Sequence, residues 1–197
     1  MFIYLIIGYI TLYLVIWSHE VGHAFFYYKY GCKSNPFNVT IPLYLAFSTP
    51  QPIDLEKENN LSLKQKFIVG IGGILVNMIF GFVGLIIIKN IEIKHNNLYQ
   101  FFLYSFVLFN FTEAASYTVI NNIYVAGDIL EVQNYKPKYR IPLFILGLVI
   151  TYIIINLIIN SPTAWRFGLI IISVVLAFLM GSLRVIFNII MKNKKGN

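Results

Sequence analysis

The feature that most constrains this chain is a glutamate between two histidines inside its first apolar stretch. Residues 18–23 read Ser-His-Glu-Val-Gly-His, with an almost wholly apolar run before them and an aromatic-rich run after them. Ionisable side chains are costly within a membrane and usually mark a functional site there. Any fold for this chain must therefore account for His19, Glu20 and His23 at membrane depth.

The spacing of these residues predicts a metal site. On a helix, His19 and His23 lie on one face, one turn apart. Two imidazoles at that spacing can bind one Zn²⁺ through nitrogen atoms at about 2.0–2.1 Å. Glu20 is rotated by about 100° from His19 and can act as general base on a zinc-bound water. The alternative is a pair of histidines that hydrogen-bond between helices.

The composition indicates a membrane protein rather than a soluble domain. Hydrophobic residues make up 58% of the chain, charged residues 12%, and the mean hydropathy is +0.72. A helix needs about 20 apolar residues to span a bilayer. The first run has no basic start and no small-residue cleavage site, so it is not expected to be a cleaved signal peptide. We predict an all-α polytopic membrane protein with about five transmembrane helices, at roughly 1–28, 67–88, 98–130, 141–159 and 166–190.

Two segments interrupt this helical pattern. Residues 37–49 are apolar and β-prone, but Pro42 confines them to an edge. We expect a short membrane-associated β-strand or hairpin there, with a plain apolar loop as the alternative. Asn121 and Asn122 lie deep in the third apolar run and predict a kinked or broken helix, which a membrane tolerates only against protein or a water-lined cavity.

The basic residues predict the orientation. Of the fifteen lysines and arginines, eleven lie in residues 29–66, in residues 132–140 or after residue 190. Because basic loops stay in the cytoplasm, the N-terminus is expected outside and the C-terminus inside. The net charge of +7 then reflects the basic residues of these loops, so we expect the lipid bilayer as a partner and no nucleic acid. The richness in Ile, Asn and Lys suggests a bacterial source, and hence a multi-pass protein of the cell membrane.

The third metal ligand remains open from the residues alone. Catalytic zinc usually has three protein ligands and a water. Of the two aspartates, Asp54 lies in a polar segment, whereas Asp128 lies at membrane depth on the same side as the histidines. A straight third span would also bring Glu113 to that half. Asp128, Glu113 and Glu131 are therefore candidates, as is a site without a third ligand.

Three separated stretches resemble one known family. Residues 19–31 read HEVGHAFFYYKYG, residues 73–77 read Gly-Ile-Leu-Val-Asn, and residues 121–128 read Asn-Asn-Ile-Tyr-Val-Ala-Gly-Asp. They resemble the zinc helix, the GxxxN helix and the Asn-x-x-Pro…Asp-Gly segment of the site-2 proteases, which are intramembrane zinc metalloproteases. Tyr124 and Ile129 stand where that family has proline and glycine.

The resemblance implies a site and a domain organisation. It implies zinc ligands His19, His23 and Asp128, the general base Glu20, and substrate contacts from Asn77, Asn121 and Asn122. Residues 1–131 would form a three-helix catalytic core, and residues 132–197 an accessory helical pair with a basic tail. The chain would be a minimal form without PDZ and CBS domains.

The function expected from this resemblance is zinc-dependent intramembrane proteolysis. The substrate would be a transmembrane segment or membrane-associated peptide of a partner protein, and it would pair with the edge at residues 37–49. One alternative is a metal-binding membrane protein without peptidase activity, such as a sensor or a transport partner. Another is a structural membrane protein with a relic site.

Overall fold

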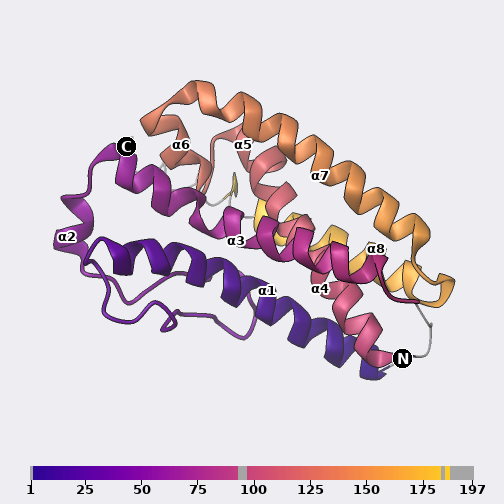
Figure 1. Ribbon diagram of the computed structural model, residues 1–197. Coiled ribbons are helices and arrows are strands. Elements are labelled where there is room, and N and C mark those ends of the chain that lie inside the picture. Colours follow the sequence, from indigo (N-terminus) through magenta and orange to yellow (C-terminus); the bar gives the residue numbers. More distant parts are fainter. Residues whose placement is uncertain (1, 93–96, 183–184, 187–197) are drawn as a thin grey trace.

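The protein is a bundle of long helices with a broken segment between its fourth and seventh helices (Figure 1). The computed structural model describes residues 2–92, 97–182 and 185–186. The long helices are α1 (Phe2–Lys29), α3 (Leu63–Lys89), α4 (Leu98–Ala115), α7 (Arg140–Asn160) and α8 (Thr163–Ala177). The shorter elements are α2 (Leu55–Asn59), the π-helix η1 (Ser116–Asn121), α5 (Asn122–Tyr124), α6 (Ile129–Tyr135), the 3₁₀-helix η2 (Pro137–Tyr139) and the π-helix η3 (Phe178–Ser182).

In the part of the chain that the structure describes, four helical stretches are long and apolar enough to cross a membrane. They are Phe2–Lys29, Leu63–Lys89, Pro137–Asn160 and Thr163–Ser182. The prediction of an all-helical protein with several membrane-spanning helices is therefore confirmed in its general form. The predicted third span begins with α4, which is not one of the four, so the count of five spans stays a prediction.

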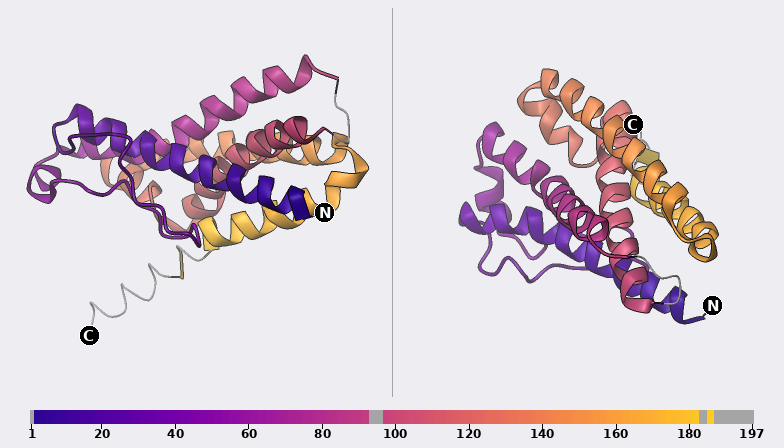
Figure 2. Two further views of the ribbon diagram at one scale, coloured as in Figure 1. Left: turned by 90° about the horizontal axis from the view of Figure 1, so that it is seen from below. Right: turned by 45° about the vertical axis from the view of Figure 1, so that its right-hand side comes forward.

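Helix α4 lies at the centre of the bundle. It packs against α1 and α3 on one side and against α7 and α8 on the other (Figures 1 and 2). Most of its side chains are buried, including Val107, Leu108 and Phe109. Because protein surrounds α4, it can carry Asn110 and Glu113 fully buried inside the bundle.

Helices α1 and α3 approach each other backbone to backbone. A Cβ atom on Gly22 would lie 2.6 Å from the carbonyl oxygen of Gly72, so neither position has room for a larger residue. Small residues permit such close crossings in membrane bundles. The crossing lies within the HEVGH turn of α1, and it sets the distance between the histidines and α3.

The chain between α1 and α2 folds back along α1 (Figure 2). Thr40 and Thr49 form an isolated antiparallel bridge, with N–H···O distances of 3.0 and 3.1 Å. Between them, Leu45 and Phe47 have positive φ angles, and Leu45 packs into the core. The part of the chain that the structure describes has no strand, so the predicted strand or hairpin at residues 37–49 stays a prediction.

Side-chain caps begin helices α2 and α3, at the end of the bundle that we predict to face the cytoplasm. Asp54 caps α2 by accepting a hydrogen bond from the backbone N–H of Lys57, and this bond lowers the pKa of Asp54. Ser62 and Gln65 form a reciprocal capping box that begins α3. The basic tail after residue 190, which enters the predicted orientation, lies outside the described residues.

Candidate metal centre

Three side chains from two distant parts of the chain converge on one point. The Nε2 atoms of His19 and His23, both on α1, lie 3.0 Å apart. Oδ2 of Asp128 lies 3.3 Å from Nε2 of His19 and 3.2 Å from Nε2 of His23. Both histidines are almost fully buried, and Oδ2 of Asp128 is a buried atom that accepts no hydrogen bond.

The Nε2 atoms of His19 and His23 and Oδ2 of Asp128 form a triangle whose size fits a tetrahedral zinc ion. Ligand atoms at about 2.0–2.1 Å from a tetrahedral centre lie roughly 3.3 Å from one another. The three distances, 3.0, 3.2 and 3.3 Å, are close to that value. Two neutral imidazoles and one carboxylate also form a donor set typical of catalytic zinc, with a fourth position left for water. The residues present therefore fit the ion that the sequence predicts.

Residues of α3 contact the Nδ1 atom of both histidines, on the side of each ring away from the proposed metal position. Nδ1 of His23 lies 2.7 Å from the carbonyl oxygen of Val69, and Nδ1 of His19 lies 3.0 Å from the amide of Asn77. A histidine that binds metal through Nε2 carries its proton on Nδ1 and donates it to such a partner. The Asn77 atom at this contact is the amide nitrogen Nδ2, and turning the amide by 180° places Oδ1, a buried atom without a hydrogen-bond partner, against Nδ1 of His19 as the acceptor.

A glycine and a tyrosine define the space around the two rings. A Cβ atom on Gly73 would lie 2.6 Å from both Cε1 of His19 and Nε2 of His23. The ring of Tyr117 stacks on His19, with centroids 4.8 Å apart and an angle of 15°. The imidazoles are thus confined between α3 and η1.

Asp128 reaches the histidines because the helix breaks, as the asparagine pair predicts. The α-helical pattern of α4 ends at Ala115, continues as the π-helix η1 and then turns at Val125, whose φ is 53°. A β-branched residue rarely adopts positive φ, and such backbone is typical of functional sites. Gly127, with φ of +55°, completes the turn directly before Asp128.

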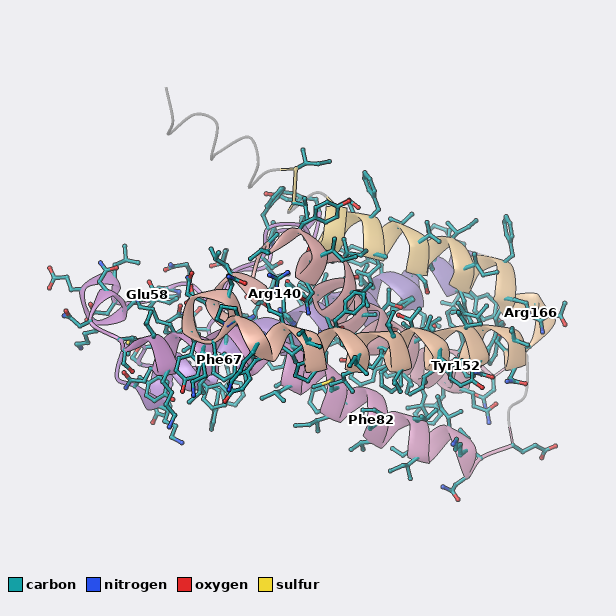
Figure 3. The ribbon with its side chains drawn as sticks, turned by 90° about the horizontal axis from the view of Figure 1, so that it is seen from above. Glu58, Phe67, Phe82, Arg140, Tyr152 and Arg166 are labelled. Carbon is teal, nitrogen blue, oxygen red and sulfur yellow. The ribbon has the colours of Figure 1, made fainter. Side chains whose placement is uncertain are left out.

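Glu20 faces the same cavity as the metal ligands. This cavity has a volume of about 400 Å³ and contains Glu20, His23 and Asp128 in its lining. Glu20 is only 2% exposed. The rest of the lining includes Tyr27, Ser48, Glu58, Asn59, Lys66 and Glu131. The cavity reaches the end of the bundle where Glu58 and Phe67 are labelled in Figure 3.

The other predicted site residues lie at different places. Glu113 is fully buried on α4 and is not part of the ligand group, and Glu131 lines the cavity without joining that group.

Asn121 is buried and donates from Nδ2 to the carbonyl of Met180 at 3.5 Å. Asn122 is buried and bonds to Arg140. Substrate contacts from Asn77, Asn121 and Asn122 stay a prediction.

Some contacts of the site had no signal in the sequence. The carbonyl of Val69 is a backbone group, so no residue type indicates it. Tyr117 stands among other polar residues of its run, and nothing singles it out as the partner of His19. The sequence shows Arg140 only as one of several basic residues in a loop, although it bonds to both sides of the Asp128 turn.

Comparison with known proteins finds no relative of this chain. No protein-family model matches the chain, and neither the curated proteins nor the solved structures contain a match. The argument for function therefore depends on the geometry of the site and on the sequence motifs.

Proposed function

We propose that this protein is a zinc-dependent intramembrane endopeptidase similar to the site-2 proteases. The observation that carries the proposal is the convergence of His19, His23 and Asp128 in a triangle of zinc-binding size. Glu20 lines the same cavity, and α1 is long and apolar enough to span a membrane. A hydrolytic site at that depth acts on a segment that is itself within the membrane.

Each residue has a chemical role in this proposal. His19, His23 and Asp128 would hold the ion, while the Val69 carbonyl and the turned amide of Asn77 would accept the Nδ1 protons of the two imidazoles. A bound zinc ion would polarise the scissile carbonyl and lower the pKa of water to about 7. The Glu20 carboxylate takes the proton from the attacking water in the cavity and passes it to the leaving amine. The cavity supplies the path for that water.

The proposed substrate is a transmembrane segment or a membrane-associated peptide of a partner protein. Proteolysis needs an extended backbone, and extended substrates often add to an exposed edge. The antiparallel bridge between Thr40 and Thr49 supports such pairing at residues 37–49. We further propose a multi-pass protein of a bacterial cell membrane, with its N-terminus outside and its C-terminus in the cytoplasm.

The test compares cleavage with zinc content. Single-span membrane proteins are co-expressed with the wild-type chain, with Glu20→Gln and with Glu56→Gln, a matched control on the exposed helix α2. We expect cleavage by the wild type and by Glu56→Gln, a loss of at least a hundredfold in Glu20→Gln, and one zinc per chain in all three.

Two other results would contradict the proposal. Zinc bound without any cleavage that depends on Glu20 would favour a non-proteolytic metal-binding protein. Purified protein without stoichiometric metal, even with His19, His23 and Asp128 intact, would favour a relic site.

A further inference from the structure

The guanidinium group of Arg140 joins the two sides of the turn that carries Asp128. Its Nε donates to Oδ1 of Asn122 at 3.1 Å, and its Nη1 donates to Oε1 of Gln133 at 2.9 Å. Its Nη2 also donates to the backbone carbonyl of Asn122, and Nδ2 of Asn122 donates back to the Arg140 carbonyl at 2.9 Å. Asn122 precedes Asp128 in the chain and Gln133 follows it.

The turn between these anchors is closed by a backbone hydrogen bond from Ala126 to Asn121 and packs through the buried Ile129, but it also holds a strained residue. Val125 holds a positive φ that β-branched residues rarely adopt, and such strained backbone persists only where its surroundings fix it. Helix α5 before it has three residues, and α6 after it begins at Ile129. On one side the turn lies against α3, where a Cβ on Gly70 would be 3.2 Å from the Asp128 carbonyl. The Arg140 contacts attach both of its ends to α7.

The partners of Arg140 indicate that its role is geometric. Among the residues that the structure describes, no ion pair involves Arg140, and its acceptors are neutral amide and carbonyl oxygens. A planar guanidinium presents five donors in a fixed fork and can hold several acceptors at once. A lysine at this position has the charge but not the fork.

We propose that Arg140 is a positioning residue for the third metal ligand, an inference that rests on the proposed zinc site. By fixing Asn122 and Gln133 to the first turn of α7, Arg140 keeps Asp128 within reach of both imidazoles. Helix α7 thereby helps to hold the third metal ligand in place and is more than an accessory element. Arg140 belongs neither to the ligand group nor to the cavity lining, so its effect passes through the backbone of residues 122–133.

The test uses metal affinity and local hydrogen exchange. Arg140→Lys, Arg140→Met and Gln133→Leu are compared with Arg166→Met. Arg166 is a matched control because it also donates to two carbonyls, those of Ile159 and Ser161. Figure 3 shows the labelled Arg166 at one end of the bundle, well separated along its length from Arg140. Zinc affinity is measured by chelator competition on detergent-solubilised full-length protein, and amide exchange is measured with and without zinc.

We expect both arginine substitutions to lower zinc affinity about 10- to 100-fold, the range seen when groups behind a metal ligand are removed. Exchange should become faster in residues 122–133 and stay unchanged in α1. Gln133→Leu removes a single bond and should have a smaller effect. It should add nothing in the Arg140→Met background, because the two residues share that bond. Arg166→Met should leave both measurements at wild-type values.

Wild-type affinity and exchange in Arg140→Lys and Arg140→Met would overturn this inference while leaving the proposed function intact. If the wild-type chain binds no zinc, the proposed function fails, and this inference fails with it as a statement about a metal ligand. The exchange of the metal-free protein then still shows whether Arg140 holds the turn. If Arg140→Met does not fold, Gln133→Leu decides, and unchanged affinity and exchange in that variant would count against the inference.

Discussion

The amide of Asn77 lies 3.0 Å from Nδ1 of His19, on the opposite side of the imidazole ring from Asp128. Both side chains are fully buried. The contact joins α3 to α1, and it reaches the ring nitrogen that a metal at Nε2 would leave protonated. Asn77 is therefore placed to orient a metal ligand, whatever further contact it makes with a substrate.

Replacing Asn77 with leucine should weaken zinc binding without unfolding the bundle. The substitution keeps the side-chain size but leaves the His19 Nδ1–H without an acceptor, and we expect a 10- to 100-fold loss of zinc affinity. Chelator competition measures it. Asn156→Leu is the control, because that asparagine bonds only to a backbone carbonyl on α7. Equal affinities in the two variants would show that the contact does not orient the histidine.

Gly73→Ala should abolish metal binding by steric conflict. The added methyl group would lie 2.6 Å from atoms of both imidazoles, and neither ring can move away while it stays in the ligand triangle. Gly168→Ala in α8 is the matched control, since its Cβ would meet nothing within 4 Å. Zinc content and thermal unfolding measure the outcome. Full zinc occupancy in Gly73→Ala would contradict the geometry of the site.

The identity of the third ligand can be decided between Asp128 and Glu113. Asp128→Ala should lose stoichiometric zinc, because a site with two histidines alone lacks a third protein ligand. Glu113→Gln should keep zinc, because Glu113 lies outside the ligand group. Metal analysis of the purified variants measures both. Zinc loss in Glu113→Gln with retention in Asp128→Ala would reverse the assignment.

The sequence predicted the part of the site that residue spacing determines. His19 and His23 four residues apart require only a helix to share a face, and the helix formed. Asn121 and Asn122 predicted the break after α4, because polar amides deep in an apolar run need a protein-lined environment. Asp128 was the leading candidate for the third ligand because few acidic residues lie at membrane depth, and the resemblance strengthened that preference over Glu113.

What the sequence left open depends on contacts between distant segments. The burial of α4 follows from how four helices pack around it, and its own residues show no strong apolar face. The carbonyl that orients His23 belongs to Val69, and backbone groups are the same in every residue. The contact of Arg140 with Asn122 depends on how α7 folds back over the broken helix, which no local pattern encodes.

Lys33 is expected to hold the loop that lines the cavity. Its ammonium group is buried, which lowers its pKa, and it donates to the carbonyls of Pro50 and Pro52 at 2.8 Å each. Lys33→Met removes both bonds. Hydrogen bonds from a charged donor contribute about 1.5–3 kcal/mol, so amide exchange at residues 46–53 should become roughly ten- to a hundredfold faster.

The control for this change is Lys57→Met, which removes a solvent-exposed pair with Asp54 on the same side of the molecule. Exposed ion pairs contribute little, so exchange at residues 46–53 should stay at the wild-type rate in that variant. Zinc affinity should be unchanged in both variants, because neither lysine contacts a metal ligand. Unchanged exchange in Lys33→Met would mean that Ser48 and Pro50 are held against the cavity by packing of the loop itself, with Leu45 anchored in the core.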